Sequence, residues 1–444
     1  MTQASTTTEV STSPDPSVVG ETVTFTATVS PVSPGAGTPT GTVTFVATDG
    51  DTTVTLTGTL SGGATSVSTN GLVTAGTYSV TATYSGDGNF TSSVGSGTHT
   101  VTQASTTTAV TTSPDPSVVG ETVTFTATVS PVSPGAGTPT GTVTFVATDG
   151  VTTVALTGTL SGGTTSVSTN GLVTAGTYSV TATYSGDSNF SSSVGSGTHT
   201  VTPAATTTAV VSAPEPSVVG ETVTLTATVS PVSPGAGTPT GTVTFVATDG
   251  LTTVTLTGTL SGGTASVTTN GLVTAGVYTV TAAYGGDGNF SGSSGSDTQT
   301  VNQASTATAV VSAPDPSVVG ESVSFTATVA PVSPGAGTPT GTVTFVIDGG
   351  GGGTLTGTLS GGTTTVSTST LDAGTHNVTA TYSGDANFAS SVGTDTQTVN
   401  QASTTTAVTS APDPSVFGEA VTLTATVAVT SPGAGSPTGT VTFV

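Results

Sequence analysis

The sequence predicts an all-β chain made of tandem antiparallel β-sandwiches, with about seven strands in each. Three observations carry this prediction. The sequence repeats itself with a period close to 100 residues, and within each copy apolar side chains alternate with Thr and Ser. Turn-forming residues separate the alternating segments about every 8–12 residues, and no segment has the apolar spacing of a helix.

The repeat defines the domain organisation. The segment that begins with Thr2-Gln3-Ala4 returns three times after 100 residues and then after 98 residues, with substitutions in the later copies. This period is too long for a solenoid, whose units have about 20–50 residues, and it matches a whole small domain. We therefore expect four complete domains and a truncated fifth, called repeats 1 to 5, at residues 1–100, 101–200, 201–300, 301–398 and 399–444.

Alternation identifies the strands of repeat 1. Strict alternation predicts a strand with one buried face and one solvent-facing face, and the branched Cβ of Thr suits the solvent-facing positions. The clearest segments are residues 22–29, 42–45, 53–57 and 77–84. Only Thr102–Ser105 lie between the last predicted strand of repeat 1 and the first of repeat 2. A flexible tether would be longer and richer in Gly and Ser, so we expect a semi-rigid extended rod.

The charge balance excludes several functions. The chain has 23 Asp and Glu residues, no Lys, Arg or Cys, and a net charge of −23. We therefore expect no nucleic-acid binding, no polybasic contact with an anionic membrane and no cysteine chemistry. No apolar stretch reaches 18 residues and no signal peptide is visible at Met1, so we expect no membrane contact by this segment and interpret it as a fragment of a longer chain.

One corner of each copy resembles an immunoglobulin-like domain. Tyr78 occupies the place of the conserved corner tyrosine, two residues before a position that antibody domains fill with Cys. In this chain Val80 stands at that position, Ala27 stands at the place of the partner Cys, and Phe45 stands at the place of the Trp. The resemblance implies apolar contact instead of a disulfide. In repeat 4 the tyrosine place is taken by His376, so the corner hydrogen bond is in doubt there.

Three stretches carry a closer resemblance: Pro16–Val29, Gly35–Phe45 and Tyr84–Phe90. The first two recur in all five copies, and together they resemble the bacterial Ig-like domain, group 3. That family occurs in tandem arrays on large bacterial surface proteins and adhesins. The resemblance implies an extracellular or cell-surface location and a spacer or adhesion module.

Acidic residues recur at fixed places and allow two interpretations. Asp and Glu beside Pro and Gly are typical of turns, where the carboxylate accepts hydrogen bonds from nearby backbone N–H groups. Alternatively, carboxylates from the facing ends of two neighbouring repeats would bind Ca²⁺, the only cofactor we consider for this chain. The candidate Ca²⁺ ligands at the three junctions are Glu21, Asp49 and Asp187; Glu121, Asp149 and Asp287; and Glu221, Asp249 and Asp385.

The remaining candidates favour packing over chemistry. His99 and His199 lie near the end of the last strand, and repeat 3 has Gln299 at that place, so we expect ordinary surface or edge-strand histidines. We expect Tyr84 in the core and Phe90 as a plug under its loop. The sequence has no plausible catalytic triad, so we expect no enzyme activity.

Two functions remain open. The first is a structural stalk or spacer of a bacterial surface or secreted protein, a monomeric rod whose parent chain contacts an unknown surface ligand elsewhere. The second is a multivalent module that binds carbohydrate or protein through repeated loops such as Ser30–Pro39, with Ca²⁺ stiffening the junctions. A disordered chain is the structural alternative.

Overall fold

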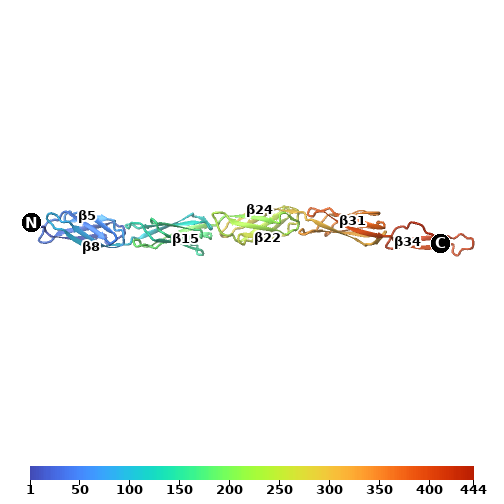
Figure 1. Cartoon of the computed structure of the whole chain (residues 1–444), viewed down its shortest axis with the longest axis horizontal. Helices are drawn as coiled ribbons and strands as arrows, with labels where there is room; N and C mark the ends of the chain where they lie inside the picture. The colour runs from blue at the N-terminus through green and yellow to red at the C-terminus, as the bar shows by residue number, and fades with distance from the viewer. The chain divides into compact units, whose positions relative to one another are not determined.

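The strands of repeat 1 follow the alternation of its sequence. The computed structural model describes residues 1–444. Each predicted segment of repeat 1 begins within one residue of a strand's first residue, and the strands extend up to three residues beyond the predicted ends. The structure also contains a two-residue strand that is too short to show any alternation. The strands are β1 (Thr6–Ser13), β2 (Ser17–Val18), β3 (Val23–Pro31), β4 (Thr42–Thr48), β5 (Thr53–Thr59), β6 (Ala64–Thr69), β7 (Gly76–Tyr84) and β8 (Ser93–Thr102) (Figure 1).

Repeats 2, 3 and 4 have the same succession of strands. In repeat 2 they are β9 (Thr106–Ser113), β10 (Ser117–Val118), β11 (Val123–Pro131), β12 (Thr142–Thr148), β13 (Thr153–Thr159), β14 (Thr164–Thr169), β15 (Gly176–Tyr184) and β16 (Ser193–Thr202). In repeat 3 they are β17 (Thr206–Ala213), β18 (Ser217–Val218), β19 (Val223–Pro231), β20 (Thr242–Thr248), β21 (Thr253–Thr259), β22 (Thr264–Thr269), β23 (Gly276–Tyr284) and β24 (Ser293–Asn302). In repeat 4 they are β25 (Thr306–Ala313), β26 (Ser317–Val318), β27 (Val323–Pro331), β28 (Thr342–Ile347), β29 (Gly353–Thr358), β30 (Thr363–Thr368), β31 (Gly374–Tyr382) and β32 (Ser391–Asn400).

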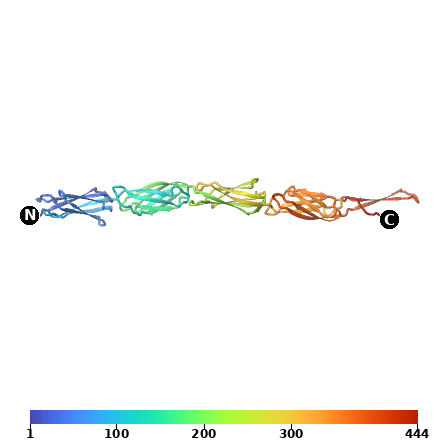
Figure 2. The same cartoon turned by 90° about the horizontal axis from the view of Figure 1, so that it is seen from above.

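Each complete repeat is a two-layered sandwich, which confirms the predicted fold class. In repeat 1 a three-stranded sheet in the order β1-β3-β6 faces a five-stranded sheet in the order β2-β8-β7-β4-β5. The two layers can be followed in Figure 2. Neighbouring strands are antiparallel, except that β2 pairs with β8 in parallel. The same two strand orders recur in repeats 2, 3 and 4.

The core of repeat 1 contains the apolar half of each alternating segment. Val23, Phe25 and Ala27 on β3 are 0–1% exposed. Phe25 packs against Phe45 of the opposite sheet, with ring centroids 6.1 Å apart. Val80 is also buried, so the places that hold the disulfide in antibody domains are filled here by apolar side chains. Burial of this kind contributes about 25 cal/mol per Å² of apolar surface.

The outward face of the three-stranded sheet is a ladder of hydroxyl groups. Thr24 and Ser68 lie opposite each other in the register of β3 and β6, and their hydroxyl oxygens are 2.9 Å apart. Thr26 and Ser66 form the next rung, also at 2.9 Å. The hydroxyls on this face therefore bind each other across the strands.

Repeat 5 contains only two paired strands, β33 (Thr404–Ala411) and β34 (Thr422–Val429). Residues 440–443, which correspond in sequence to the start of β4, are not a strand in the structure. Phe417 and Leu423 are 109% and 48% exposed, whereas Phe325 at the place of Leu423 in repeat 4 is fully buried.

The chain divides into two compact units. The first comprises Met1–Thr206, Pro231–Thr238 and Gly286–Ser291, and therefore contains repeats 1 and 2. The second comprises Thr207–Ser230, Pro239–Gly285 and Gly292–Val444, and therefore contains repeat 4 and repeat 5. Because every regular element is a strand, neither unit has a helix with the length and hydrophobicity that crossing a membrane requires.

Candidate functional site

The segment before β7 forms a hydrogen-bonded corner, defined in repeat 1 as Thr74–Gly76. The hydroxyl of Thr74 lies 2.5 Å from the hydroxyl of Tyr78 and donates to a carboxylate oxygen of Asp49. The backbone N–H of Thr52 donates to the other oxygen of that carboxylate, at 2.7 Å. These hydrogen bonds, the one from Thr74 first, lower the pKa of Asp49 to about 2. The arrangement confirms the tyrosine corner and leaves Asp49 ionised at neutral pH.

The loop between β7 and β8 ends in a tight tip, defined in repeat 1 as Asp87–Phe90. One carboxylate oxygen of Asp87 accepts hydrogen bonds from the N–H groups of Asn89 and Phe90, at 2.7 and 2.9 Å. The other oxygen accepts hydrogen bonds from the hydroxyl and the N–H of Thr40, at 2.7 and 2.9 Å. These bonds, led by that from the Thr40 hydroxyl, hold the pKa of Asp87 well below its usual range. Phe90 is 4% exposed beneath the tip, as predicted.

Two further acidic residues lie near β2. A carboxylate oxygen of Glu21 accepts the N–H of Val18 at 2.9 Å and closes a local turn. Asp15 accepts the N–H of Thr100 on β8 at 3.0 Å, a residue 85 positions away. The turn interpretation is therefore confirmed for Glu21, Asp49 and Asp87, whereas Asp15 joins two separate segments.

The structure places the candidate Ca²⁺ ligands in separate turns. No group of three or more His, Asp or Glu side chains in residues 1–444 is arranged so that it could hold a metal ion. Each candidate of the later junctions likewise accepts a hydrogen bond within its own repeat. The bonded pairs are Glu121 with Val118, Asp149 with Thr174, Asp287 with Asn289, Glu221 with Val218, Asp249 with Thr274, and Asp385 with Thr340. Ca²⁺ binding by these residues stays a prediction.

The prediction that His99 and His199 are surface or edge-strand residues is wrong. Both side chains are fully buried. Nε2 of His99 lies 2.8 Å from Oγ of Ser17, and Nδ1 lies 3.0 Å from Oγ1 of Thr12 and 3.5 Å from a carboxylate oxygen of Asp15. Alternation with Thr98 and Thr100 places His99 on the same face as the buried Val101, but its partner Ser17 lies on the two-residue strand β2 and has no such signal.

Ser17, His99 and Asp15 have the residue types of a hydrolase triad, but the arrangement is structural. Ser17 is 1% exposed, so a substrate cannot approach its hydroxyl. In repeat 3 the imidazole is replaced by Gln299, whose Nε2 donates to Ser217 at 3.2 Å and to the carbonyl of Pro214 at 3.0 Å. His99 and Gln299 therefore share a structural role: each fills the same place in the core and binds the serine of the two-residue strand.

His376 in repeat 4 is a different kind of buried histidine. It takes the place of the corner tyrosine, and its ring nitrogens lie 2.7 Å from the carbonyl oxygen of Asp348 and 2.9 Å from that of Asp372. A carbonyl oxygen only accepts, so both bonds require the doubly protonated ring. Burial alone would lower the pKa of His376, but the two carbonyls and the carboxylates of Asp348 and Asp372 raise it overall.

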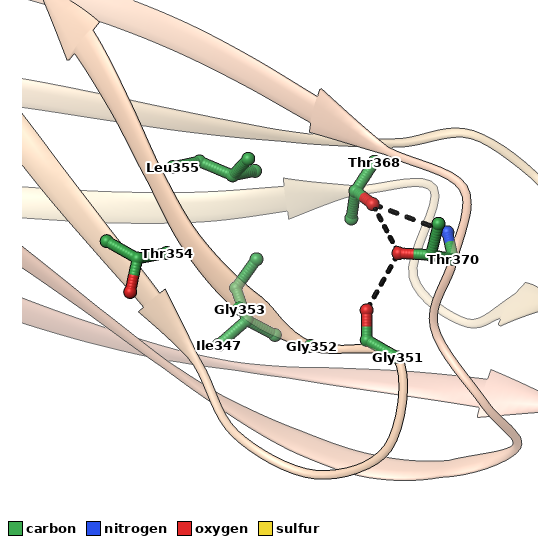
Figure 3. A pocket seen from close by; sticks show the side chains of 8 residues that line it. All are labelled: Ile347, Gly351, Gly352, Gly353, Thr354, Leu355, Thr368 and Thr370. Carbon is green, nitrogen blue, oxygen red and sulfur yellow. Dashed lines mark hydrogen bonds between the residues drawn. The ribbon is translucent and has the colours of Figure 1, made fainter.

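Beside this corner, repeat 4 has a small pocket in its glycine-rich hairpin. Its volume is about 90 Å³, well below the roughly 300–1,000 Å³ of ordinary ligand pockets. Figure 3 shows the hydrogen bond from the hydroxyl of Thr370 to the carbonyl of Gly351, both of which line the pocket. The two oxygen atoms are 2.7 Å apart. The pocket can hold a few water molecules, and its lining is Ile347, Gly351, Gly352, Gly353, Thr354, Leu355, Thr368 and Thr370.

The structure adds one residue that the sequence analysis missed. Oδ1 of Asn189, at the tip of repeat 2, accepts the backbone N–H of Ala75 at the corner of repeat 1, with an N···O distance of 3.0 Å. The available signal was that an Asn follows the tip aspartate by two residues in all four complete repeats: Asn89, Asn189, Asn289 and Asn387.

Comparison with known proteins identifies the repeats. The family model for the bacterial Ig-like domain, group 3, matches residues 10–103, 110–202, 210–302 and 310–400. A search of curated proteins found no match to this chain.

Solved structures give weaker similarities. An Escherichia coli alpha-2-macroglobulin activated by porcine elastase is 14% identical, with a TM-score of 0.21, over 92% of this chain and 46% of that chain. A Salmonella alpha-2-macroglobulin reacted with methylamine is 10% identical, with a TM-score of 0.22, over 89% of this chain and 31% of that chain. A multidomain titin fragment is 15% identical, with a TM-score of 0.28, over 68% of this chain and 100% of that chain. These TM-scores are too low to carry an argument about function.

Proposed function

The chain belongs to the family of bacterial Ig-like domains, group 3, and from this premise we propose that it is a non-catalytic stalk or spacer segment of a bacterial extracellular or cell-surface protein of the adhesin type. Domains of this family are commonly extracellular or surface-associated. In this proposal the segment is monomeric, contacts neither nucleic acid nor membrane, and leaves ligand binding to other parts of its parent chain.

The observation that carries the proposal is the short, bonded connector between complete sandwiches. β8 ends at Thr102 and β9 begins at Thr106, and between them the N–H of Ala104 donates to the carbonyl of Asn189 at 3.0 Å. A connector of this length that is itself hydrogen-bonded gives the next sandwich little freedom. Repeating such a unit adds reach without requiring a new binding site.

Small-angle X-ray scattering of the full chain tests the spacer function. If each repeat adds about 35–45 Å to the length of a rod, the chain would be about 150–200 Å long, with a radius of gyration of about 45–60 Å. A compact globule of this length would have a radius of gyration of about 22 Å, and an unfolded chain about 78 Å. A value near either of these two would contradict the proposal.

A second candidate function is multivalent binding of carbohydrate or protein. It is favoured by a valine that stays 42–46% exposed at one place in the loop after the third strand of each complete repeat: Val32, Val132, Val232 and Val332. Glycan-array and cell-binding assays of the full chain distinguish the two candidates. Specific binding that is lost when all four valines are changed to Ser would favour this second function over a passive spacer.

A further inference from the structure

Within the first unit, repeat 2 contacts repeat 1 at two separate points. The first is the bond from the N–H of Ala75 to Oδ1 of Asn189. The second is a backbone bond from the N–H of Ala136, in the loop between β11 and β12, to the carbonyl oxygen of Val19, at 3.0 Å. Two bonds at different places restrain rotation as well as separation.

The second contact depends on a glycine. Gly20 has a φ of +73°, and a Cβ added there would lie 2.6 Å from the carbonyl oxygen of Ala136. The N–H of Gly20 also donates to the carbonyl of Leu72, at 3.0 Å, which ties the contact to the segment leading into the corner. A side chain at this position would therefore push the two repeats apart.

Both partners of the first contact are held in place by carboxylates. Asp187 accepts the N–H of Asn189 at 2.8 Å and so fixes the tip that carries the amide. Asp49 accepts the hydroxyl of Thr74, the residue immediately before Ala75, and so fixes the corner that presents the N–H. Asp187 and Asp49, which we considered as Ca²⁺ ligands, thus hold in place the amide of Asn189 and the N–H of Ala75 that bind each other.

The same contacts recur at other junctions. In the second unit the N–H of Ala275 donates to Oδ1 of Asn387 at 2.9 Å, and the N–H of Ala336 donates to the carbonyl of Val219 at 3.0 Å. In the first unit Ala175 donates to Asn289 at 2.8 Å. Asn189, Asn289 and Asn387 are half-buried, whereas Asn89, which meets no corner in this structure, is exposed.

We propose that the tip asparagine and the alanine–glycine contact form a docking lock, in which each end of a repeat fits the opposite end of another copy and fixes its orientation without a metal ion. Asn189 is the positioning residue of this lock at the first junction, and Gly20 sets the distance of approach. The lock rests on the proposed spacer function, because it supplies the stiffness that a spacer needs.

Pulsed electron–electron double resonance, which measures the distance between two spin labels, tests the lock at the first junction of the full chain. The chain has no Cys, so Val94→Cys and Val194→Cys, both at positions 64% exposed, can be spin-labelled without competition. We expect one narrow distance distribution between the labels in the parent chain. Asn189→Ala should broaden it about twofold or more, toward the spread of a flexible connector.

Matched variants separate the lock from general loss of structure. Asn89→Ala changes the same side chain where it meets no corner and should leave the distribution unchanged, whereas Asn189→Asp keeps an acceptor oxygen and should restore the narrow distribution. Gly20→Ala should shift the mean distance, but Gly62→Ala should not, since Gly62 also has a positive φ yet has no atom within 4 Å of an added Cβ. Melting curves establish that each variant is folded.

Each outcome decides between the proposals. A parent distribution that is already broad would overturn both the lock and the spacer function. A narrow parent distribution that Asn189→Ala leaves narrow would overturn the lock and leave the spacer standing. A distribution that broadens when EDTA removes divalent cations would show that a metal ion holds the junction, and would also overturn the lock as proposed.

Discussion

Nε2 of His99 lies 2.8 Å from Oγ of Ser17, and both side chains are buried between the two sheets of repeat 1. Burial disfavours the imidazolium and lowers the pKa of His99, although the charges of Asp15 and Glu21 act in the opposite direction. Folding therefore favours the neutral form of the His99 ring, and burial lowers the pKa of His199 in repeat 2 in the same way.

Mild acid should destabilise repeats 1 and 2. The pKa of His99 and His199 is lower in the folded state than the ordinary value of 6.5, so the unfolded chain takes up protons first as the pH falls. Their contribution to stability is complete above pH 6.5 and is lost as the pH falls toward the folded pKa. The loss is at most about 1.4 kcal/mol per pH unit for each histidine.

Hydrogen exchange of β8 and β16 between pH 7 and pH 5, corrected for intrinsic rates, measures this loss. The double variant His99→Gln and His199→Gln introduces the side chain that repeat 3 already has at Gln299, and it should remove the pH dependence. An equal loss of protection in β24 of repeat 3 over the same range would show that the histidines are not the cause.

Repeat 4 should respond to pH in the opposite direction. The pKa of His376 is raised, so its contribution is complete below pH 6.5 and is lost as the pH rises through the folded pKa. The neutral ring can donate to only one of the carbonyls of Asp348 and Asp372. We expect faster hydrogen exchange at the start of β31 at pH 8.5 than at pH 5.5, after the same correction.

His376→Gln is the matched variant for this prediction. It removes the titrating group and retains one donor, so protection at β31 should be lower than in the parent chain at pH 5.5 and nearly independent of pH. A parent chain whose β31 gains protection as the pH rises would contradict the assignment of a charged ring.

Removal of one core ring should weaken one repeat. Phe45 is 1% exposed and packs on Phe25, so Phe45→Ala should lower the free energy of unfolding of repeat 1 by about 3–5 kcal/mol. Val94→Ala, at a position 64% exposed, is the control and should change it by less than about 0.5 kcal/mol. Urea unfolding followed by hydrogen exchange in each repeat makes the measurement, and equal destabilisation of repeats 1 and 4 would argue against separate cores.

Salt should stabilise the chain slightly or leave it unchanged. The net charge is −23 and the chain has no Lys or Arg, so screening removes far more repulsion than attraction. The Debye length falls from about 30 Å at 0.01 M to about 8 Å at 0.15 M salt, and melting temperatures in NaCl over this range and up to about 0.5 M test the expectation. A clear fall in melting temperature would contradict it.

Much of the fold could be predicted because alternate residues of a strand lie on opposite faces, so the apolar or polar character of each residue indicates its face. Phe25, Phe45 and Tyr84 are buried as predicted, and each follows a Thr that lies on the opposite, less buried face of its strand. Strand β2 could not be predicted, because its two residues show no period. For the same reason Ser17 could not be recognised as the partner of His99.

The local chemistry of the carboxylates could also be predicted, but their relationship across repeats could not. Asp87 beside glycine is a turn signal that sequence alone reveals. The bond between Ala75 and Asn189 joins residues 114 positions apart and uses a backbone N–H, which has no sequence signature. Only the three-dimensional arrangement of corner and tip reveals it.

The hydroxyl ladder has a consequence for the flanks of the sandwich. Because Thr24 and Thr26 are satisfied by Ser68 and Ser66, these groups have less need of outside hydrogen-bonding partners. They also carry no charge. A flank built in this way presents neutral hydroxyls that are already paired with each other, and offers an approaching molecule no charge at these rungs.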